Sequence, residues 1–481
     1  MKKIALLTTV LIMGVTTIAS PVTTQRAKHV AATVLQKADA ELVEVGKDVG
    51  FQHLFCFNQT DGKGFVVVSS DDCFTPVIAF SEENSLNPND INPSARWWLE
   101  QYDKAAQMSV KEYDPFIAKQ WQDLEDGVWA SNSKHDKILS LLDGISWNQG
   151  APYNMLCPGG SVTGCVATAY GQIMRYWKYP EHGFGSHSYT GEGKPIHYPV
   201  WNYGTLSADF EHTYYDWEHM PKVAYINSSD TAKMAVATLL YHIGVALDMN
   251  YSPNGSMSWS LYEYSIAEGA GELDPEIGSE YRIPRYFGYR YDYAGMRDSI
   301  GDDARWNEML YQSLAEGKPI YYAGWSEDAS SPLGYSTTSG HGFVIDGYRD
   351  GGGTSYYRLN WGWGGSSDGW FTIDNLRPRV SVGSSETYDF TKWHGAVIGF
   401  APDSSRLNIQ PIQTQQGKAF GINGAILVRE AQGSSIAVYD MMGRCVAQRG
   451  KTDDSEWRCN VRRGIYVVRI GNGKGIKVAS Y

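Results

Sequence analysis

One cysteine in this sequence stands where a helix is expected to begin. Cys165 opens the stretch CVATAYGQIMRYW, in which Val166, Ala169, Ile173 and Trp177 recur at helical spacing. Unpaired backbone N–H groups and the helix dipole favour the thiolate over the thiol at such a position. Because the thiolate is the nucleophilic form, the segment is compatible with covalent catalysis at Cys165. Taken alone, it fits a buried structural cysteine equally well.

A nucleophilic cysteine needs an imidazole beside it, and His341 has the most suitable context among the 11 histidines. It follows the polar run EDASSPLGYSTTSG and heads the apolar segment GFVIDGY, which indicates a junction between a loop and a strand. The strand would fix the backbone while the ring faces a cleft. There the imidazole could hold the proton of Cys165 and pass it to a leaving amine. His242 lies in an apolar helical stretch and is expected in the core.

Three further residues complete the expected site. Asn360 ends the strand-like run YYRLN, and a hairpin would return it beside His341, where its side-chain oxygen could accept the imidazole N–H. Trp361 would cover that hydrogen bond and exclude water. Gln149 could point its amide into the same cleft and stabilise an oxyanion together with the backbone N–H of Cys165.

The elements that must hold these residues follow a change of composition along the chain. Residues 133–402 are expected to begin with helices and end in strand-like runs such as KPIYYAGW and GWFTIDNL, which predicts an α+β domain. Residues 23–132 form a separate α+β unit, and the polar stretch 129–137 is expected to be an exposed connector, open to proteolysis. Residues 403–418 are expected to be a linker, and 419–481 alternate strands with turns as in a small β-sandwich.

Within the first unit, two segments have helical spacing, residues 24–42 and 93–108. Between them, HLFCFNQTDGKGFVVVSSDD predicts two strands around an Asp-Gly turn, and TPVIAFS predicts a third.

Composition and the N-terminus limit the possible classes of protein. The chain has 481 residues and a formal net charge of -12 without a basic stripe, which disfavours nucleic acid and anionic membrane as partners. Residues 1–22 combine two lysines, a short apolar run and small residues, so we expect a signal peptide and no membrane anchor. The 6 cysteines lack zinc-site spacing, and no metal or organic cofactor is implied. Disulfides between Cys56 and Cys73, or between Cys445 and Cys459, remain open alternatives.

The motifs around these residues resemble those of the streptopain family of papain-like cysteine peptidases. The order Gln, Cys, His, Asn-Trp is kept within NQGAPYN, TGCVATAYGQIMRYWKYP, GHGFVIDGY and NWGWGGSSDGWF. The resemblance implies a two-lobed papain-like fold and an endopeptidase that acts on proteins and peptides. It also implies an apolar pocket for the substrate residue two before the cut, near Ala323, Gly324 and Gly340. Ala323 stands where the family carries a larger polar side chain.

The flanking units resemble known modules as well. Residues 23–132, particularly GKGFVVVSSDDCFTPVIAFS, resemble the family's pro-domain, which implies an inactive precursor cut near residues 130–137. The C-terminal unit resembles a type IX secretion sorting domain in VYDMMGRCVAQ and RRGIYVVRIGNGKGIKV. That resemblance implies export through the periplasm, contact with a secretion machinery, and a secreted or cell-surface protein.

Two other classes of function fit parts of the pattern. An acyltransferase or transglutaminase would use Cys, His and Asp in the same order, with Asp346 or Asp368 as the third member. Asp346 shares a strand with His341 and is expected to point elsewhere. A surface adhesin on an inactive peptidase scaffold is the second alternative, although all four catalytic elements are intact.

Overall fold

The computed structural model contains two compact units, Met1–Pro402 and Asp403–Tyr481. The structure describes residues 20–89, 91–108, 113–130, 133–190, 202–261, 275–324, 340–374, 393–403, 405 and, except for 423–424, 430, 432–433, 441–442, 452–453, 455, 463 and 472–475, residues 418–480. Most of the predicted signal peptide and of the predicted linker therefore lies outside the described residues. None of the helices in the described part of the chain is long and apolar enough to cross a membrane.

The N-terminal segment, residues 20–130, packs helices against a small antiparallel set of strands. The predicted strands and the helix over 93–108 are confirmed, but the first helix ends at Leu35 because Gln36 takes the left-handed conformation, with φ 56°. The elements are α1 (Thr24–Leu35), β1 (Leu42–Glu44), α2 (Gly46–Val49), β2 (Leu54–Gln59), β3 (Phe65–Ser69), β4 (Val77–Ser81), α3 (Pro93–Met108) and α4 (Pro115–Glu125).

Helices dominate the next part of the chain, residues 139–290, here called the helical lobe. Helices α5 and α6 pack closely at Gly171, where an added Cβ would lie 2.5 Å from Leu240 and 3.0 Å from Trp147. His242 is buried in α6 and its ring contacts the Tyr215 hydroxyl at 3.1 Å, which confirms its expected place in the core. The elements are α5 (Cys165–Trp177), β5 (Ser186–Thr190), β6 (Thr205–Asp209), α6 (Asp230–Ala246), α8 (Ser279–Phe287) and β7 (Tyr289–Arg290).

Residues 293–402, here called the sheet lobe, supply most of a large antiparallel sheet. Strand β10 lies inside this sheet between β9 and β11, and its first eight residues are buried. The elements are β8 (Tyr293–Met296), α9 (Arg297–Ile300), α10 (Asp303–Ala315), β9 (Ile320–Gly324), β10 (His341–Gly351), β11 (Thr354–Asn360), β12 (Gly369–Phe371), β13 (His394–Ile398) and β14 (Ala401–Pro402).

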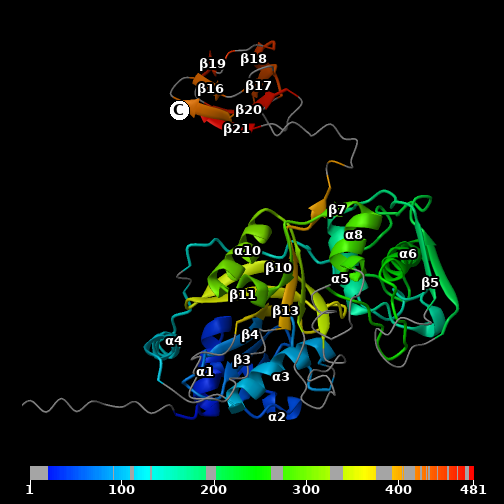
Figure 1. Ribbon diagram of the computed structural model, residues 1–481. Coiled ribbons are helices and arrows are strands. Elements are labelled where there is room, and N and C mark those ends of the chain that lie inside the picture. Colours follow the sequence, from blue (N-terminus) through cyan, green and yellow to red (C-terminus); the bar gives the residue numbers. More distant parts are fainter. Residues whose placement is uncertain are drawn as a thin grey trace, which may run out of the picture. The chain divides into compact units, whose positions relative to one another are not determined.

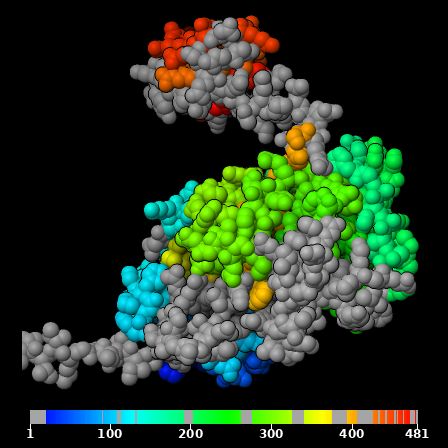
Figure 2. All heavy atoms as spheres, in the orientation of Figure 1, coloured from blue at the N-terminus to red at the C-terminus, as the bar shows by residue number. Residues whose placement is uncertain are grey.

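The sheet extends from the sheet lobe into the N-terminal segment. Strand β12 pairs with β4 of the N-terminal segment, with Trp370 opposite Phe80, so ten strands form one sheet in the order β1-β2-β3-β4-β12-β11-β10-β9-β13-β8. Figure 1 shows the blue N-terminal strands continuing the yellow strands of the sheet lobe. Helix α4, cyan in Figure 2, lies against the same lobe, and Gln120 of this helix donates to the Gly352 carbonyl at 2.8 Å. The N-terminal segment and the sheet lobe therefore share one sheet, and two hydrophobic clusters contain buried residues of both.

The C-terminal unit is a small β-sandwich, as predicted. Its two antiparallel sheets have the orders β15-β16-β19 and β18-β17-β20-β21 and enclose a core that includes Ile426, Val438 and Val468. Cys56, Cys445 and Cys459 are thiols in this structure, so neither possible disulfide is formed. The strands are β15 (Lys418–Ile422), β16 (Ala425–Arg429), β17 (Ile436–Asp440), β18 (Cys445–Arg449), β19 (Glu456–Asn460), β20 (Gly464–Ile470) and β21 (Ile476–Ser480).

Candidate active site

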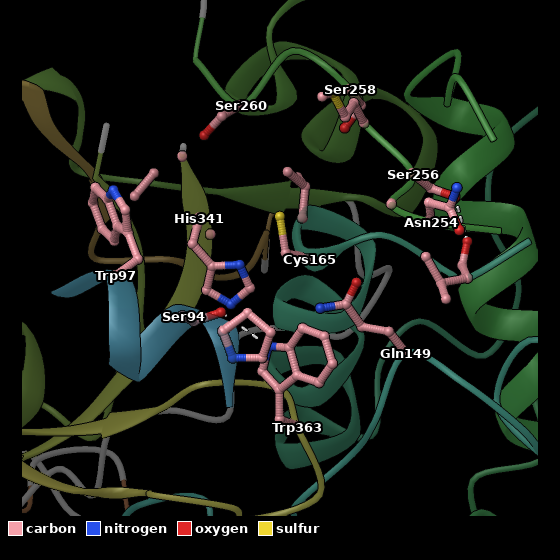
Figure 3. Close-up of a pocket in the computed structure, with 18 of the residues that line it drawn as sticks. Ser94, Trp97, Gln149, Cys165, Asn254, Ser256, Ser258, Ser260, His341 and Trp363 are labelled. Carbon is pink, nitrogen blue, oxygen red and sulfur yellow. Dashed lines mark hydrogen bonds between the residues drawn. The ribbon is translucent and has the colours of Figure 1, made fainter. Parts of the chain in front are cut away.

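Cys165 is the first residue of α5, so the predicted helix start is confirmed. The residue before it, Gly164, has φ 87° and forms the N-cap. A Cβ at Gly164 would lie 2.9 Å from the Met249 side chain and 3.1 Å from the Ser256 carbonyl, so both the conformation and the space require glycine. This turn directs the half-buried Cys165 thiol toward a cleft between the two lobes (Figure 3).

His341 is the first residue of β10, at the predicted junction of loop and strand, and its ring faces the sulfur of Cys165 (Figure 3). The ring nitrogen Nε2 lies 2.9 Å from the main-chain oxygen of Trp361. A carbonyl only accepts, so Nε2 carries the hydrogen in this contact and Nδ1 is the nitrogen left for the thiol. The structure thus brings together the two residues that the sequence analysis singled out first.

The electrostatics of this pair favour the thiolate. Burial raises the pKa of the Cys165 thiol, but the charge of the His341 ring and its hydrogen bond to the sulfur lower it. Hydrogen bonds from the backbone N–H groups of Gly342 and Val166 act in the same direction, and the net result is a pKa below the ordinary thiol value. A thiol in this environment is therefore easier to ionise than an ordinary cysteine.

The expected hydrogen bond between the Asn360 side chain and His341 is not formed, and this part of the prediction is corrected. Asn360 Nδ2 donates to the Ile145 carbonyl at 2.9 Å, and its Oδ1 accepts from Gly362 N–H at 3.0 Å. The reason is the register of the sheet: Asn360 lies opposite Val344, three residues beyond His341. Side chains alternate between faces along a strand, so Asn360 and His341 do not share a face.

Asn360 nevertheless touches the group that orients His341. The peptide between Trp361 and Gly362 carries both the carbonyl that accepts from His341 and the N–H that donates to Asn360. Trp361 itself is fully buried, with its ring centroid 6.4 Å from that of His341, but the Asn360–His341 hydrogen bond that it was expected to cover is not formed.

Gln149 is buried and its amide points into the cleft beside Cys165 (Figure 3). Its backbone is held on both sides, by Thr163 N–H donating to its carbonyl at 3.0 Å and by Asn148 Oδ1 accepting from its N–H at 2.7 Å. The backbone N–H of Cys165 belongs to the first turn of α5, where N–H groups have no intrahelical acceptor. The Gln149 amide and the Cys165 backbone N–H are thus two donors from different elements near the sulfur.

Gln149, Cys165 and His341 line a cavity of about 520 Å³. Its wall includes the loop over residues 253–258, together with Ser260, Ala323 and Gly340. Two of the three residues predicted near a substrate pocket therefore reach the cavity. The third, Gly324, pairs with His341 in the sheet and would place a Cβ 3.1 Å from Trp97.

Comparisons with known proteins agree with this geometry. Residues 147–371 match the model of the Peptidase C10 family, and residues 19–106 match that of the Spi protease inhibitor family. A fragment of prointerpain A from Prevotella intermedia has a similar structure, with a TM-score of 0.52 and 30% identity over 72% of this chain and 96% of that one. The chain belongs to the Peptidase C10 family.

Curated relatives of this C10 peptidase point to the same chemistry. Streptopain of Streptococcus pyogenes is 28% identical over 411 residues, which cover 79% of this chain and 91% of that protein. The thiol protease/hemagglutinin PrtT of Porphyromonas gingivalis is 30% identical over 365 residues, or 73% of this chain and 37% of that protein. The chain is a cysteine peptidase with an N-terminal pro-domain.

In this C10 peptidase the pro-domain reaches the cleft, a feature that the sequence analysis missed. Pro93, Ser94 and Trp97, all from α3, line the same cavity as Cys165. Ser94 Oγ accepts a hydrogen bond from Trp363 Nε1 at 2.9 Å, beside the ring of His341 (Figure 3). The sequence held two signals for this contact: the tryptophan pair in the predicted helix 93–108 and the second tryptophan of NWGWGG.

The two aspartates considered for an acyltransferase triad do not contact His341. Asp346 accepts hydrogen bonds from Arg358 at 3.0 Å and from the Ser140 hydroxyl, so it points elsewhere as expected. Asp368 accepts from the Trp361 backbone N–H at 3.0 Å. The geometry of this C10 peptidase therefore gives no support to a Cys-His-Asp triad.

Proposed function

We propose that the protein is a secreted cysteine endopeptidase made as a zymogen, with Cys165 as nucleophile and His341 as its proton-transfer partner. The observation that carries the proposal is the contact between these two side chains at the start of α5, in a cavity large enough for a peptide segment. Gln149 supplies an oxyanion donor, and Asn360 and Trp361 fix the orientation of His341 through the main chain.

The proposed reaction begins from the ion pair of thiolate and imidazolium. The Cys165 sulfur attacks the carbonyl carbon of the scissile peptide bond, and the oxygen becomes an anion that the Gln149 amide and the Cys165 N–H stabilise. The imidazolium of His341 gives its proton to the departing amine as the C–N bond breaks. Water, deprotonated by the neutral imidazole, then attacks the thioester carbon; the C–S bond breaks, the acid leaves, and the thiolate–imidazolium pair is restored.

Inhibition by the pro-domain is part of the proposal, with domain bounds of 23–132 and 133–402. It is supported by the match of residues 19–106 to an inhibitor family and by α3, whose side chains line the cavity. The proposed cut lies near residues 130–137. The described residues of this connector, 129–130 and 133–137, are only partly exposed: Trp129 packs against Gly351, and the His135 ring centroid lies 3.8 Å from that of Tyr311.

Small residues in the cavity wall indicate where one side chain of the substrate binds. We infer that Ala323 and Gly340 lie beside the substrate side chain two residues before the cut, with Gly324 behind them. Small residues leave room for a bulky apolar side chain at this place.

Export is the least directly supported part of the proposal. It rests on the signal-like residues 1–22 and on the C-terminal β-sandwich, whose motifs resemble a type IX sorting domain. Deleting residues 419–481 from the full chain in a type IX-secreting host should retain the peptidase in the periplasm. Normal appearance of the truncated chain outside the cell would exclude the sorting role.

Hydrolysis of an unstructured protein tests the activity itself. The processed protein and a Cys165→Ala variant cleaved at the same place are incubated under reducing conditions, and cleavage is followed by mass spectrometry. We expect cleavage within the chain only with the Cys165 protein, and products bearing a new carboxyl group even when an amine is added. Equal cleavage by both proteins would refute the role of Cys165, and transfer to the amine without hydrolysis would indicate an acyltransferase.

A further inference from the structure

The turn that follows β11 is held at two main-chain positions. Trp361 N–H donates to Asp368 Oδ1 at 3.0 Å, and the next N–H, that of Gly362, donates to Asn360 Oδ1 at the same distance. Both side chains are buried, with Asn360 1% and Asp368 2% exposed. The carbonyl of Trp361, which accepts from His341, lies between these two anchored N–H groups.

Asp368 reaches Trp361 from the far end of the turn. The residue before it, Ser367, has φ 61°, a left-handed conformation that a residue other than glycine rarely adopts. With this conformation the Ser367 carbonyl accepts from the Trp361 indole N–H at 3.2 Å, while Asp368 accepts from the Trp361 backbone. Two consecutive residues thus hold both N–H groups of the residue that orients His341.

We propose that Asp368 is a positioning residue for His341: its carboxylate fixes the Trp361 main chain, and the Trp361 carbonyl in turn fixes the imidazole. A carboxyl group suits this task because an oxygen can accept from the Trp361 N–H whether or not the group is ionised. This positioning role requires no direct contact between Asp368 and the reacting atoms. This inference rests on the proposed roles of Cys165 and His341.

Burial and the charged groups around Asp368 shift the pKa of its carboxyl group. Burial raises the pKa of Asp368 to about 7, while the Arg358 guanidinium on β11 and the Trp361 N–H lower it. Asp346 on β10 and Glu83 of the pro-domain raise it further. Other charged residues that line the adjacent pocket are Glu82, Lys137 and Asp143. Burying a carboxyl group costs free energy of desolvation, and a neutral amide at the same place would avoid the cost of a buried charge.

A comparison of two neighbouring carboxylates tests the inference. Asp368→Ala and Asp346→Ala remove the same atoms from the same buried cluster, but Asp346 does not contact Trp361. Asp368→Asn keeps an oxygen that can accept from Trp361. Each variant is made in the full chain, and the processed enzymes are compared per titrated active site for kcat, for KM and for the pH dependence of Cys165 alkylation by iodoacetamide.

We expect Asp368→Ala to lower kcat about 10- to 100-fold with KM little changed, because small misplacements of a catalytic group have effects of this size. Its alkylation curve should move to higher pH, since a displaced His341 stabilises the thiolate less. Asp368→Asn should recover most of the lost kcat, and Asp346→Ala should keep the wild-type kcat and alkylation curve despite a lower unfolding temperature.

Two results would overturn the inference. One is equal loss of kcat in Asp368→Ala and Asp346→Ala, which would show an effect through stability alone. The other is an alkylation curve unchanged by Asp368→Ala. Failure of the proposed function itself has a different signature: alkylation of Cys165 in the wild-type enzyme would leave hydrolysis intact.

Discussion

The indole N–H of Trp363 donates to Ser94 Oγ at 2.9 Å, so a residue from the wall of the catalytic cleft is bonded directly to a helix of the pro-domain. The contact lies beside the His341 ring (Figure 3). Asn92, the residue immediately before α3, also donates to the Ser366 carbonyl in the same turn. The pro-domain therefore holds the segment that orients His341 as well as covering the cavity.

Ser94→Ala should weaken this hold. It removes one hydrogen-bond acceptor, worth about 1 kcal/mol, which corresponds to a roughly fivefold weaker association of pro-domain and cleft. We expect faster processing of the full-length precursor, as measured by electrophoresis, and an unchanged kcat/KM of the processed enzyme. The matched control is Ser69→Ala, whose hydroxyl donates to the Thr75 carbonyl inside the pro-domain. Equal acceleration by both variants would assign the effect to pro-domain stability rather than to the cleft.

Gln149→Ala should act on the chemical step. Loss of one oxyanion donor lowers kcat by about 100- to 1000-fold, with KM little affected, because the donor is needed only when the oxygen carries charge. The alkylation rate of Cys165 should not change, since the lowered thiol pKa depends on His341, Gly342 and Val166. Parallel losses of hydrolysis and alkylation would instead indicate a disturbed Cys-His pair.

Ala323→Val should alter substrate selection. Ala323 is 1% exposed and forms part of the cavity wall, so two extra methyl groups reduce the space for a substrate side chain. We expect kcat/KM for peptides with leucine two residues before the cut to fall about 10-fold or more relative to those with alanine there. The ratio of the two substrates in one enzyme preparation provides the control. A ratio equal to that of the wild-type enzyme would place this subsite elsewhere.

Asp368 should make the stability of the precursor depend on pH. Its pKa rises from 3.8 to about 7 on folding, so between these values the folded state binds more protons than the unfolded state. The free energy of unfolding should therefore fall as pH rises from about 4 to about 7, by up to about 4 kcal/mol.

Urea unfolding at several pH values measures this effect. Both proteins compared carry Cys165→Ala, which prevents processing. The variant that also carries Asp368→Asn should lose stability less steeply over this range. Parallel curves for the two proteins would show that Asp368 keeps an ordinary pKa.

Several features followed from the sequence because neighbouring residues decide them. The spacing of apolar residues predicted α3 over 93–108 and a helix starting at Cys165, and both are present because an amphipathic helix buries one face wherever it packs. His341 at the head of β10 followed in the same way from a polar run before an apolar strand. The family also followed from the sequence, since its motifs are contiguous stretches.

Other features depend on which residues the tertiary structure places together. The sheet register sets Asn360 opposite Val344, and so the Trp361 carbonyl, rather than the Asn360 side chain, accepts from His341. The pairing of β4 with β12 brings α3 to the cleft from far away in the sequence. The left-handed turn at Ser367 directs Asp368 back to Trp361. The sequence by itself determined that Cys165 begins a helix and His341 begins a strand, since helix and strand starts are local. Only the tertiary structure decided what orients and covers them, because strand register and long-range pairing depend on the packing of the whole sheet.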